Sequence, residues 1–276
     1  MTRRSTPALV LLHIRAQNRL FWRVPIGAFF TLALPVIMLV LFVALFGNEP
    51  EGSVVGTITP AQFYTPALAV FSVGSATYTN IAINLSTRRE EGILRRVRGT
   101  PLPPWVYMAG AVGSAVWIGV IALVVMVGLG VIAYDVNLEV AKLPAMALTF
   151  VVGSMCFAML GIALAGVAKS ASSASALANA TILPMAFISN IFINLGTNPP
   201  EWLQVLGDLL PLRHFGLAFA EAMSPFSETP AILWDRLGVL LSWTAVGALL
   251  ARWRFRWDPV PGANGRTTRR GRRTTA

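Results

Sequence analysis

Charge is scarce in this sequence. Asp, Glu, Lys and Arg make up 12% of its 276 residues, whereas soluble domains carry roughly 25%. Hydrophobic residues make up 55%, and the mean hydropathy is +0.65. So few charges cannot cover the surface of a water-soluble globule of this size. The composition therefore excludes an ordinary cytosolic enzyme and a disordered chain.

Cysteine is almost absent as well. Cys156 is the only one, so no disulfide can form within the chain. This excludes a small secreted domain held together by disulfides. Because Cys156 falls inside an apolar run, we expect it to be a small buried hydrophobic residue.

Long apolar runs are abundant instead, and the first five of six contain no charged residue. About 20 apolar residues are needed to cross a hydrocarbon core of about 30 Å. Such runs must be helical because lipid offers no partner to backbone amides. The sequence therefore predicts an all-α integral membrane protein with six transmembrane helices. The runs are 24–46, 61–85, 105–133, 143–167, 170–195 and 237–251, the last extended upstream by 231–234 across Asp235 and Arg236.

The charged residues divide between the two sides that these runs define. Segments 1–23, 86–104, 168–169 and 252–276 hold nineteen of the 22 basic residues, and the other connections hold nine of the 12 acids. By the positive-inside rule, this predicts a multi-pass protein with both termini in the cytoplasm.

The two terminal segments fit the same arrangement. Residues 1–23 mix apolar and basic residues, which favours a helix lying in the cytoplasmic interface, although an extension of the first span would also fit. The basic tail 252–276 is explained by topology and by contact with anionic membrane lipid. No nucleic-acid partner is therefore needed to explain the net charge of +10.

Residues for catalysis and metal binding are missing. No G-x-x-x-x-G-K-[ST] occurs, because neither Lys142 nor Lys169 follows a glycine, so the chain has no P-loop of its own for ATP. The only histidines, His13 and His214, fall on opposite sides of the predicted membrane, which excludes a histidine metal cluster. We expect no catalytic residue, no metal and no cofactor bound by this chain. The first five runs also lack ionisable side chains for coupling to protons, so energy for transport would come from another subunit.

One cytoplasmic connection carries a recognisable pattern. Residues 86–104 predict a short basic helix, on which Leu94 and Val97 form one apolar side. Pro101 and the prolines after it end the helix before the third run. Taken alone, this segment is a positively charged loop between two spans.

The loop resembles the cytoplasmic signature of type-2 ATP-binding-cassette (ABC) exporter permeases, which runs roughly E-x-G-[TI]-L-x-x-[LV]-x-x-T-P-L. The resemblance implies that this segment is a coupling helix resting in a groove of a separate nucleotide-binding ATPase subunit. Leu94 and Val97 would seat in that groove, and the partner would use ATP and Mg. The implied coupling residues are Glu90, Glu91, Gly92, Leu94, Val97, Thr100 and Pro101.

The resemblance extends along residues 1–251, which would form one six-span transmembrane domain followed by the basic cytoplasmic tail 252–276. It implies an extracytoplasmic hairpin at 196–230, with Pro199, Trp202 and Pro211 as its markers. It also implies a second permease chain, as a homo- or heterodimer, and a bacterial inner (plasma) membrane location.

Polar residues recur along two of the predicted spans. Thr77, Asn80 and Asn84 share one helix face, and Asn179, Asn190 and Asn194 share another at 100° per residue. They would line a translocation path or a dimer interface. Alternatively, they would form hydrogen bonds between helices, which average about 0.6 kcal/mol each.

The function predicted from these features is that of a permease subunit of an ATP-driven ABC exporter. It would move an amphiphilic substrate, such as a drug, an antibiotic or a lipid-like molecule, out of the cytoplasm or the inner leaflet. One alternative is a non-transporting membrane sensor or scaffold that docks an ATPase. Another is an intramembrane transferase, against which the missing catalytic groups argue.

Overall fold

The computed structural model describes residues 6–23, 25–49, 58–192, 200–255 and 257–258. All regular structure within these ranges is helical, which confirms the predicted all-α class. The elements are α1 (Thr6–Trp22), α2 (Pro25–Phe46), α3 (Pro60–Gly74), the π-helical turn η1 (Ser75–Thr79), α4 (Asn80–Glu90), α5 (Ile93–Arg98), α6 (Pro104–Tyr134), the 3-10 turn η2 (Val140–Lys142), α7 (Leu143–Val167), α8 (Ala171–Ile188), α9 (Glu201–Leu209), α10 (Pro211–Met223) and α11 (Trp234–Arg254).

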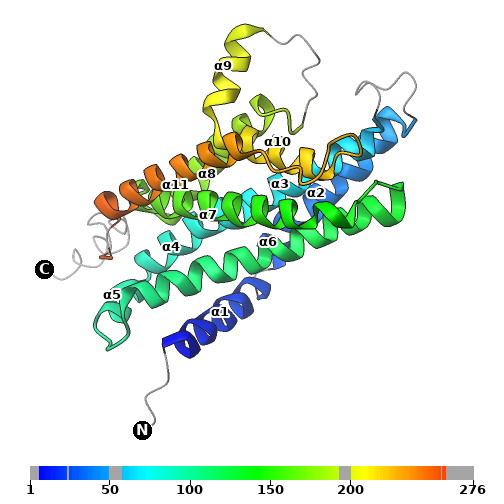
Figure 1. Cartoon of the computed structure of the whole chain (residues 1–276). Coiled ribbons are helices and arrows are strands. Elements are labelled where there is room, and N and C mark those ends of the chain that lie inside the picture. The colour runs from blue at the N-terminus through cyan, green and yellow to red at the C-terminus, as the bar shows by residue number, and fades with distance from the viewer. Residues whose placement is uncertain (1–5, 24, 50–57, 193–199, 256, 259–276) are drawn as a thin grey trace, which may run out of the picture.

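The long helices form an elongated bundle with two distinct ends (Figure 1). Helix α5 and the ends of α4 and α11 lie at one end, and the connection between α6 and α7 lies at the other. Helix α1 lies outside the bundle, alongside α6. This arrangement puts the basic loop 86–104 and the end of α11 on the same side, as the charge pattern predicts.

Three helices of the described residues have the length and hydropathy of a membrane span: Pro104–Tyr134, Val140–Val167 and Ala171–Ile188. Thr31–Phe46 is apolar but shorter. Helices α3, η1 and α4 follow one another without a break, and α11 carries charged residues in its first and last turns. The count of six spans therefore stays a prediction.

The helix that leads to the basic loop contains a π-turn in its middle, Ser75–Thr79. Helix α7 passes very close to it, because a Cβ on Gly161 would lie 2.7 Å from the backbone oxygen of Tyr78. Only a glycine leaves room for this approach. The Tyr78 hydroxyl lies 2.7 Å from that of Thr181, so α8 is also connected to the turn.

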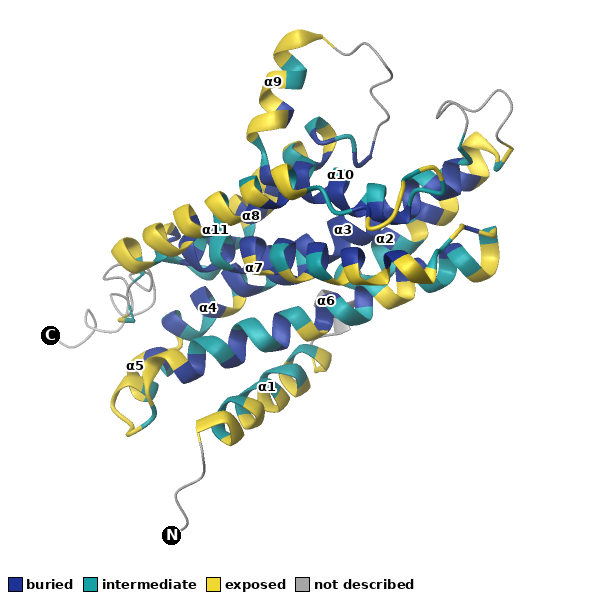
Figure 2. Ribbon diagram, in the orientation of Figure 1, coloured by how far each residue is buried: buried dark blue, intermediate teal, exposed yellow. Residues whose placement is uncertain are grey.

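The core consists of two clusters of buried side chains. The larger one lies between α3, α7 and α10 and includes Phe71, Phe157 and Phe215. The smaller one lies near α5 and includes Leu85 and Leu94. Large apolar side chains are also exposed along the outer faces of the helices (Figure 2), and an exposed apolar surface of this kind suits contact with lipid or with another chain.

Candidate functional site

The basic loop forms a sharp turn followed by a short helix. Helix α4 ends at Glu90, and Gly92 then adopts a left-handed conformation with φ 69° before α5 begins at Ile93. Glycine adopts this conformation without the steric cost that a side chain brings. The Thr100 hydroxyl donates to the Val97 carbonyl at 2.7 Å, which closes the last turn of α5.

The apolar side of α5 faces inward, which corrects the expectation that it would seat in a partner's groove. Leu94 is fully buried among side chains of the small cluster, including Leu85 and Tyr107. Val97 is half-buried and packs against the same cluster, as does Trp257 from beyond the end of α11. In this conformation Leu94 therefore holds α5 against the bundle and does not face a partner.

The outward surface of the loop is polar and largely basic. We call it the coupling surface, and its exposed residues are Glu91, Arg95, Arg96, Arg98, Gly99, Thr100 and Pro101. Arg96 donates to the Glu91 carbonyl at 3.4 Å, and Arg98 lies 3.6 Å from the Asp258 carboxylate. Three arginines against one glutamate favour a partner surface with negative charge.

Two adjacent residues at the end of α4 reach the turn between α7 and α8. Arg89 is buried, and its guanidinium donates to the carbonyl oxygens of Ala165 at 2.7 Å and Ala168 at 2.5 Å. The Glu90 carboxylate accepts the backbone N–H of Ala171 at 2.9 Å. Glu90 is among the coupling residues expected from the sequence, whereas no sequence pattern pointed to Arg89.

The first polar strip divides into two environments. Thr77 is fully buried and donates to the Val73 carbonyl of its own helix at 2.7 Å. Asn84 is exposed, and its side-chain amide donates to the Asn80 carbonyl at 3.0 Å and to the Asn80 side-chain oxygen. Asn80, Asn84 and Arg88 line a shallow recess together with residues of α1 and α6. The recess therefore lies between α1, α4 and α6.

The second polar strip does not form one helix face. Asn179 is exposed and donates to the Ser175 carbonyl at 3.0 Å. Helix α8 ends at Ile188, and Asn190 adopts φ 65° beyond it. The Ile191 N–H donates to the Ala186 carbonyl at 3.1 Å, which is the pattern of a helix terminated by a left-handed residue. Asn194 lies outside the described residues.

The hairpin is built from α9 and α10. Pro199 lies outside the described residues, and α9 begins at Glu201. Trp202 on α9 is exposed, whereas Pro211 is buried and begins α10. The Trp243 indole N–H donates to the Leu209 carbonyl at 3.1 Å, so the hairpin is tied to α11.

Charged residues hold the same hairpin near α11. Asp208 lies 3.4 Å from Arg213 and 3.6 Å from Arg236. His214 is buried, and its Nε2 donates to the Asp208 carbonyl at 2.7 Å. Arg236 lies 3.3 Å from the other ring nitrogen of His214. Within the described part of the chain, these two partners of His214 belong to the hairpin and to α11, which indicates that the histidine has an anchoring role.

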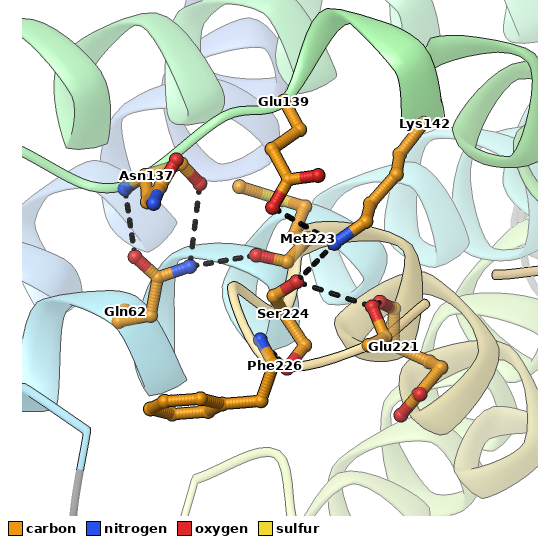
Figure 3. A network of polar contacts seen from close by, with 9 residues as sticks. Gln62, Asn137, Glu139, Lys142, Glu221, Met223, Ser224 and Phe226 are labelled. Carbon is orange, nitrogen blue, oxygen red and sulfur yellow. Dashed lines mark hydrogen bonds and ion pairs between the residues drawn. The ribbon is translucent and has the colours of Figure 1, made fainter. Parts of the chain in front are cut away.

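A further polar network lies at the opposite end from α5, and the sequence analysis did not identify it (Figure 3). The Gln62 amide donates to the Met223 carbonyl at 2.8 Å and accepts the Asn137 N–H at 2.8 Å. The buried Lys142 ammonium donates to the Ser224 carbonyl at 2.7 Å and lies 3.0 Å from the Glu139 carboxylate. The network joins the start of α3, the α6–α7 connection and the end of α10.

Among the described residues, no group of three or more His, Cys, Asp or Glu is placed to hold a metal ion. The polar side chains described above form hydrogen bonds within or between helices, or they are exposed on the surface.

Comparisons with known proteins agree with this picture. The profile of the family described as ABC-2 type transporter matches residues 8–223. The Inner membrane transport permease YadH of Escherichia coli K12 is 26% identical over 76% of this chain and 81% of its own length. The Putative transport permease YvfS of Bacillus subtilis is 26% identical over 79% and 86%. The Daunorubicin resistance ABC transporter permease protein DrrB1 of Streptomyces coeruleorubidus is 30% identical over 87% and 81%.

Proposed function

The chain belongs to the ABC-2 type transporter family, and on that premise we propose that it is the membrane subunit of an ATP-driven exporter. A transport permease of this kind needs no catalytic group of its own. In our proposal a separate ATPase subunit binds ATP and Mg and hydrolyses the nucleotide. The permease converts the resulting motion into substrate movement.

The observation that carries this proposal is the basic coupling surface on α5. It lies at one end of the bundle, on a helix that the buried Leu94 fixes to α4 and α6 (Figure 1). A displacement of α5 must therefore also move the helices to which it is packed. The charge of Arg95, Arg96 and Arg98 favours an ATPase groove lined with acidic residues.

A second permease chain completes the proposed pathway. The supporting feature is an exposed row of small residues on α8, namely Ser172, Ala176 and Ala180. Small residues four positions apart allow two helices to approach closely in a membrane. The partner is either an identical chain or a related one, and co-purification of two differently tagged copies of this chain distinguishes the two forms.

For the substrate we propose an amphiphilic molecule exported from the cytoplasm or the inner leaflet. The support is the relative whose name states daunorubicin resistance, together with the apolar character of the helices. Daunorubicin is therefore the first probe to use. The sensor or scaffold alternative would still bind an ATPase but would move no substrate.

The proposal is tested in inside-out vesicles that contain the permease and its co-purified ATPase. Uptake of fluorescent daunorubicin and of a fluorescent phospholipid is followed with ATP and Mg, and vesicles without the permease serve as the control. We expect ATP-dependent uptake of at least one probe. ATP hydrolysis by the bound ATPase with neither probe moved would favour the sensor or scaffold, and a permease without any bound ATPase would contradict the proposal.

A further inference from the structure

The turn between α7 and α8 depends on side chains from another helix. Helix α7 ends at Val167, and α8 begins at Ala171 after the cap residue Ser170. The N–H of Lys169 donates to the Ser173 hydroxyl at 3.1 Å, so it does not bond to the Ala165 carbonyl as a continued helix would require. Arg89 binds that carbonyl and the Ala168 carbonyl instead.

The start of α8 likewise has a backbone N–H group that a side chain from another helix binds. Ser170 and Ser173 cap each other through a reciprocal pair of bonds. The N–H of Ala171 in the first turn is bound by Glu90. A cation therefore lies at the end of α7 and an anion at the start of α8, which is the arrangement that helix dipoles favour.

Arg89 and Glu90 lie only a few residues before α5 in the sequence, so they connect the α7–α8 turn to the coupling surface. Glu90 is the last residue of α4, and α5 begins at Ile93. Leu94 of α5 also packs in one cluster with Ala158 and Ala165 of α7. The end of α4, α5 and the α7–α8 turn are thus held together by packing and by three hydrogen bonds.

We propose that Arg89 and Glu90 are positioning residues that transmit displacement of α5 to the α7–α8 turn. The inference rests on the proposed function and adds a second route for the motion. Movement started by the ATPase subunit enters the bundle through α4 and, at the same time, through α7 and α8. Helix α8 carries the small-residue row proposed for the second permease chain, so the tie connects ATP-driven motion to that interface.

Uncharged replacements of Glu90 and Arg89 are expected to differ in their effect on coupling. Glu90→Gln keeps a side-chain oxygen that accepts the Ala171 N–H, whereas Glu90→Ala removes it. Arg89→Met leaves the Ala165 and Ala168 carbonyls buried without this donor. If the hydrogen bond carries the coupling and the negative charge of Glu90 is not needed, Glu90→Gln retains most of the coupling. Glu90→Ala and Arg89→Met then lose it.

The contact itself is tested on the permease alone in lipid nanodiscs, without any ATPase. Hydrogen exchange of peptides covering residues 168–174 is compared between wild type and Glu90→Ala. We expect faster exchange in the variant, and unchanged exchange in Glu228→Gln, which alters an exposed carboxylate elsewhere. Equal exchange in wild type and Glu90→Ala would overturn the inference.

Transmission is tested in the complex with its ATPase. A fluorescent probe is placed on Lys169→Cys, an exposed position in the turn, with Cys156→Ala as the background. Addition of ATP is expected to change the probe signal in wild type, Glu90→Gln and Glu228→Gln. In Glu90→Ala the change per bound ATPase is expected to fall roughly two- to thirtyfold, the range expected when a coupling contact is lost. ATPase binding and hydrolysis are measured in the same samples, so that a loss of docking is distinguished from a loss of transmission.

A double variant distinguishes transmission from simple stabilisation of α8. Glu90→Ala with Ala171→Glu places a carboxylate in the first turn of α8 but not on α4, and it leaves the small-residue row of α8 unchanged. We expect it to restore slow exchange at 168–174 without restoring the ATP-dependent signal. A restored signal, or a full signal in Glu90→Ala, would overturn the inference. So would a wild-type complex that hydrolyses ATP without any change at the probe. A wild-type permease that binds no ATPase would instead contradict the proposed function.

Discussion

Gln62 and Lys142 hold neighbouring carbonyl groups at the end of α10. Gln62 donates to the Met223 oxygen at 2.8 Å, and Lys142 donates to the Ser224 oxygen at 2.7 Å (Figure 3). Gln62 comes from the start of α3, and Lys142 is the last residue of η2, directly before α7. The end of α10 is therefore fixed from two sides, at the opposite end of the bundle from α5.

The first prediction concerns this buried lysine. Lys142→Met should leave the Ser224 carbonyl without its donor and the Glu139 carboxylate without its cation. We expect a loss of about 1–3 kcal/mol in stability, which is the cost of an unsatisfied buried polar group. Lys169→Met, which alters the chain's only other lysine at an exposed site, should stay within about 0.5 kcal/mol of wild type. Thermal unfolding in detergent measures both, and equal melting temperatures would contradict the assignment.

The second prediction concerns the approach of α7 to the π-turn. Gly161→Ala should force α7 away from Tyr78, because the new Cβ would lie 2.7 Å from its backbone oxygen. Overpacking of this kind costs about 1–3 kcal/mol. Gly128→Ala on α6 is the matched control, since its Cβ would meet nothing within 4 Å. Unfolding midpoints of the two variants are compared, and a Gly161→Ala protein as stable as Gly128→Ala would show that the approach is not tight.

The third prediction concerns topology. Glu91→Cys and Glu201→Cys, each in a Cys156→Ala background, place a thiol at the two ends of the bundle. We expect a membrane-impermeant maleimide to label residue 201 in intact cells and to label residue 91 only after permeabilisation. Both glutamates are exposed, and the permease is expressed without an ATPase subunit, so failure to label cannot be attributed to burial. Labelling of residue 91 alone in intact cells would show that the permease has the opposite orientation.

Sequence patterns predicted the all-α class and the family because both depend on local features. A long uncharged run is visible as such, and so is a loop with its glycine and prolines. The inward face of α5 was not predictable in the same way. Leu94 and Val97 do form one side of a short helix, but only the tertiary fold shows that Ile81, Leu85 and Tyr107 cover Leu94.

The hydrogen bonds between helices could not be predicted from the sequence for a related reason. Arg88 and Arg89 are indistinguishable in sequence, yet Arg88 lies 6.0 Å from the Tyr107 ring and Arg89 is buried against α7. The Ser224 carbonyl that Lys142 binds lies 82 positions away along the chain. Asn190 fitted a helical face by spacing, but an asparagine also suits the left-handed residue that ends a helix, and the structure has it in that role.

The last prediction concerns the coupling surface and follows from the burial of Leu94. Charging Leu94 would disrupt the fold of the loop and would not report on docking. The exposed arginines offer a cleaner test, because reversing their charge changes the surface without disturbing the cluster beneath. Arg95→Glu together with Arg96→Glu would repel an acidic groove, and each lost charged contact is worth roughly 1.5–3 kcal/mol.

We therefore expect the double variant to reach the membrane at normal levels and to lose most of its co-purifying ATPase. Arg252→Glu with Arg254→Glu is the control, because it reverses two exposed arginines that lie at the end of α11, at the same end of the bundle but outside the coupling surface. Pull-down of the ATPase through a tag on the permease measures the difference. Binding is also expected to weaken as salt is raised, since exposed charge contacts are screened. If both double variants retain the ATPase equally, the arginines of α5 do not form the docking surface, and the partner must contact the permease through other residues.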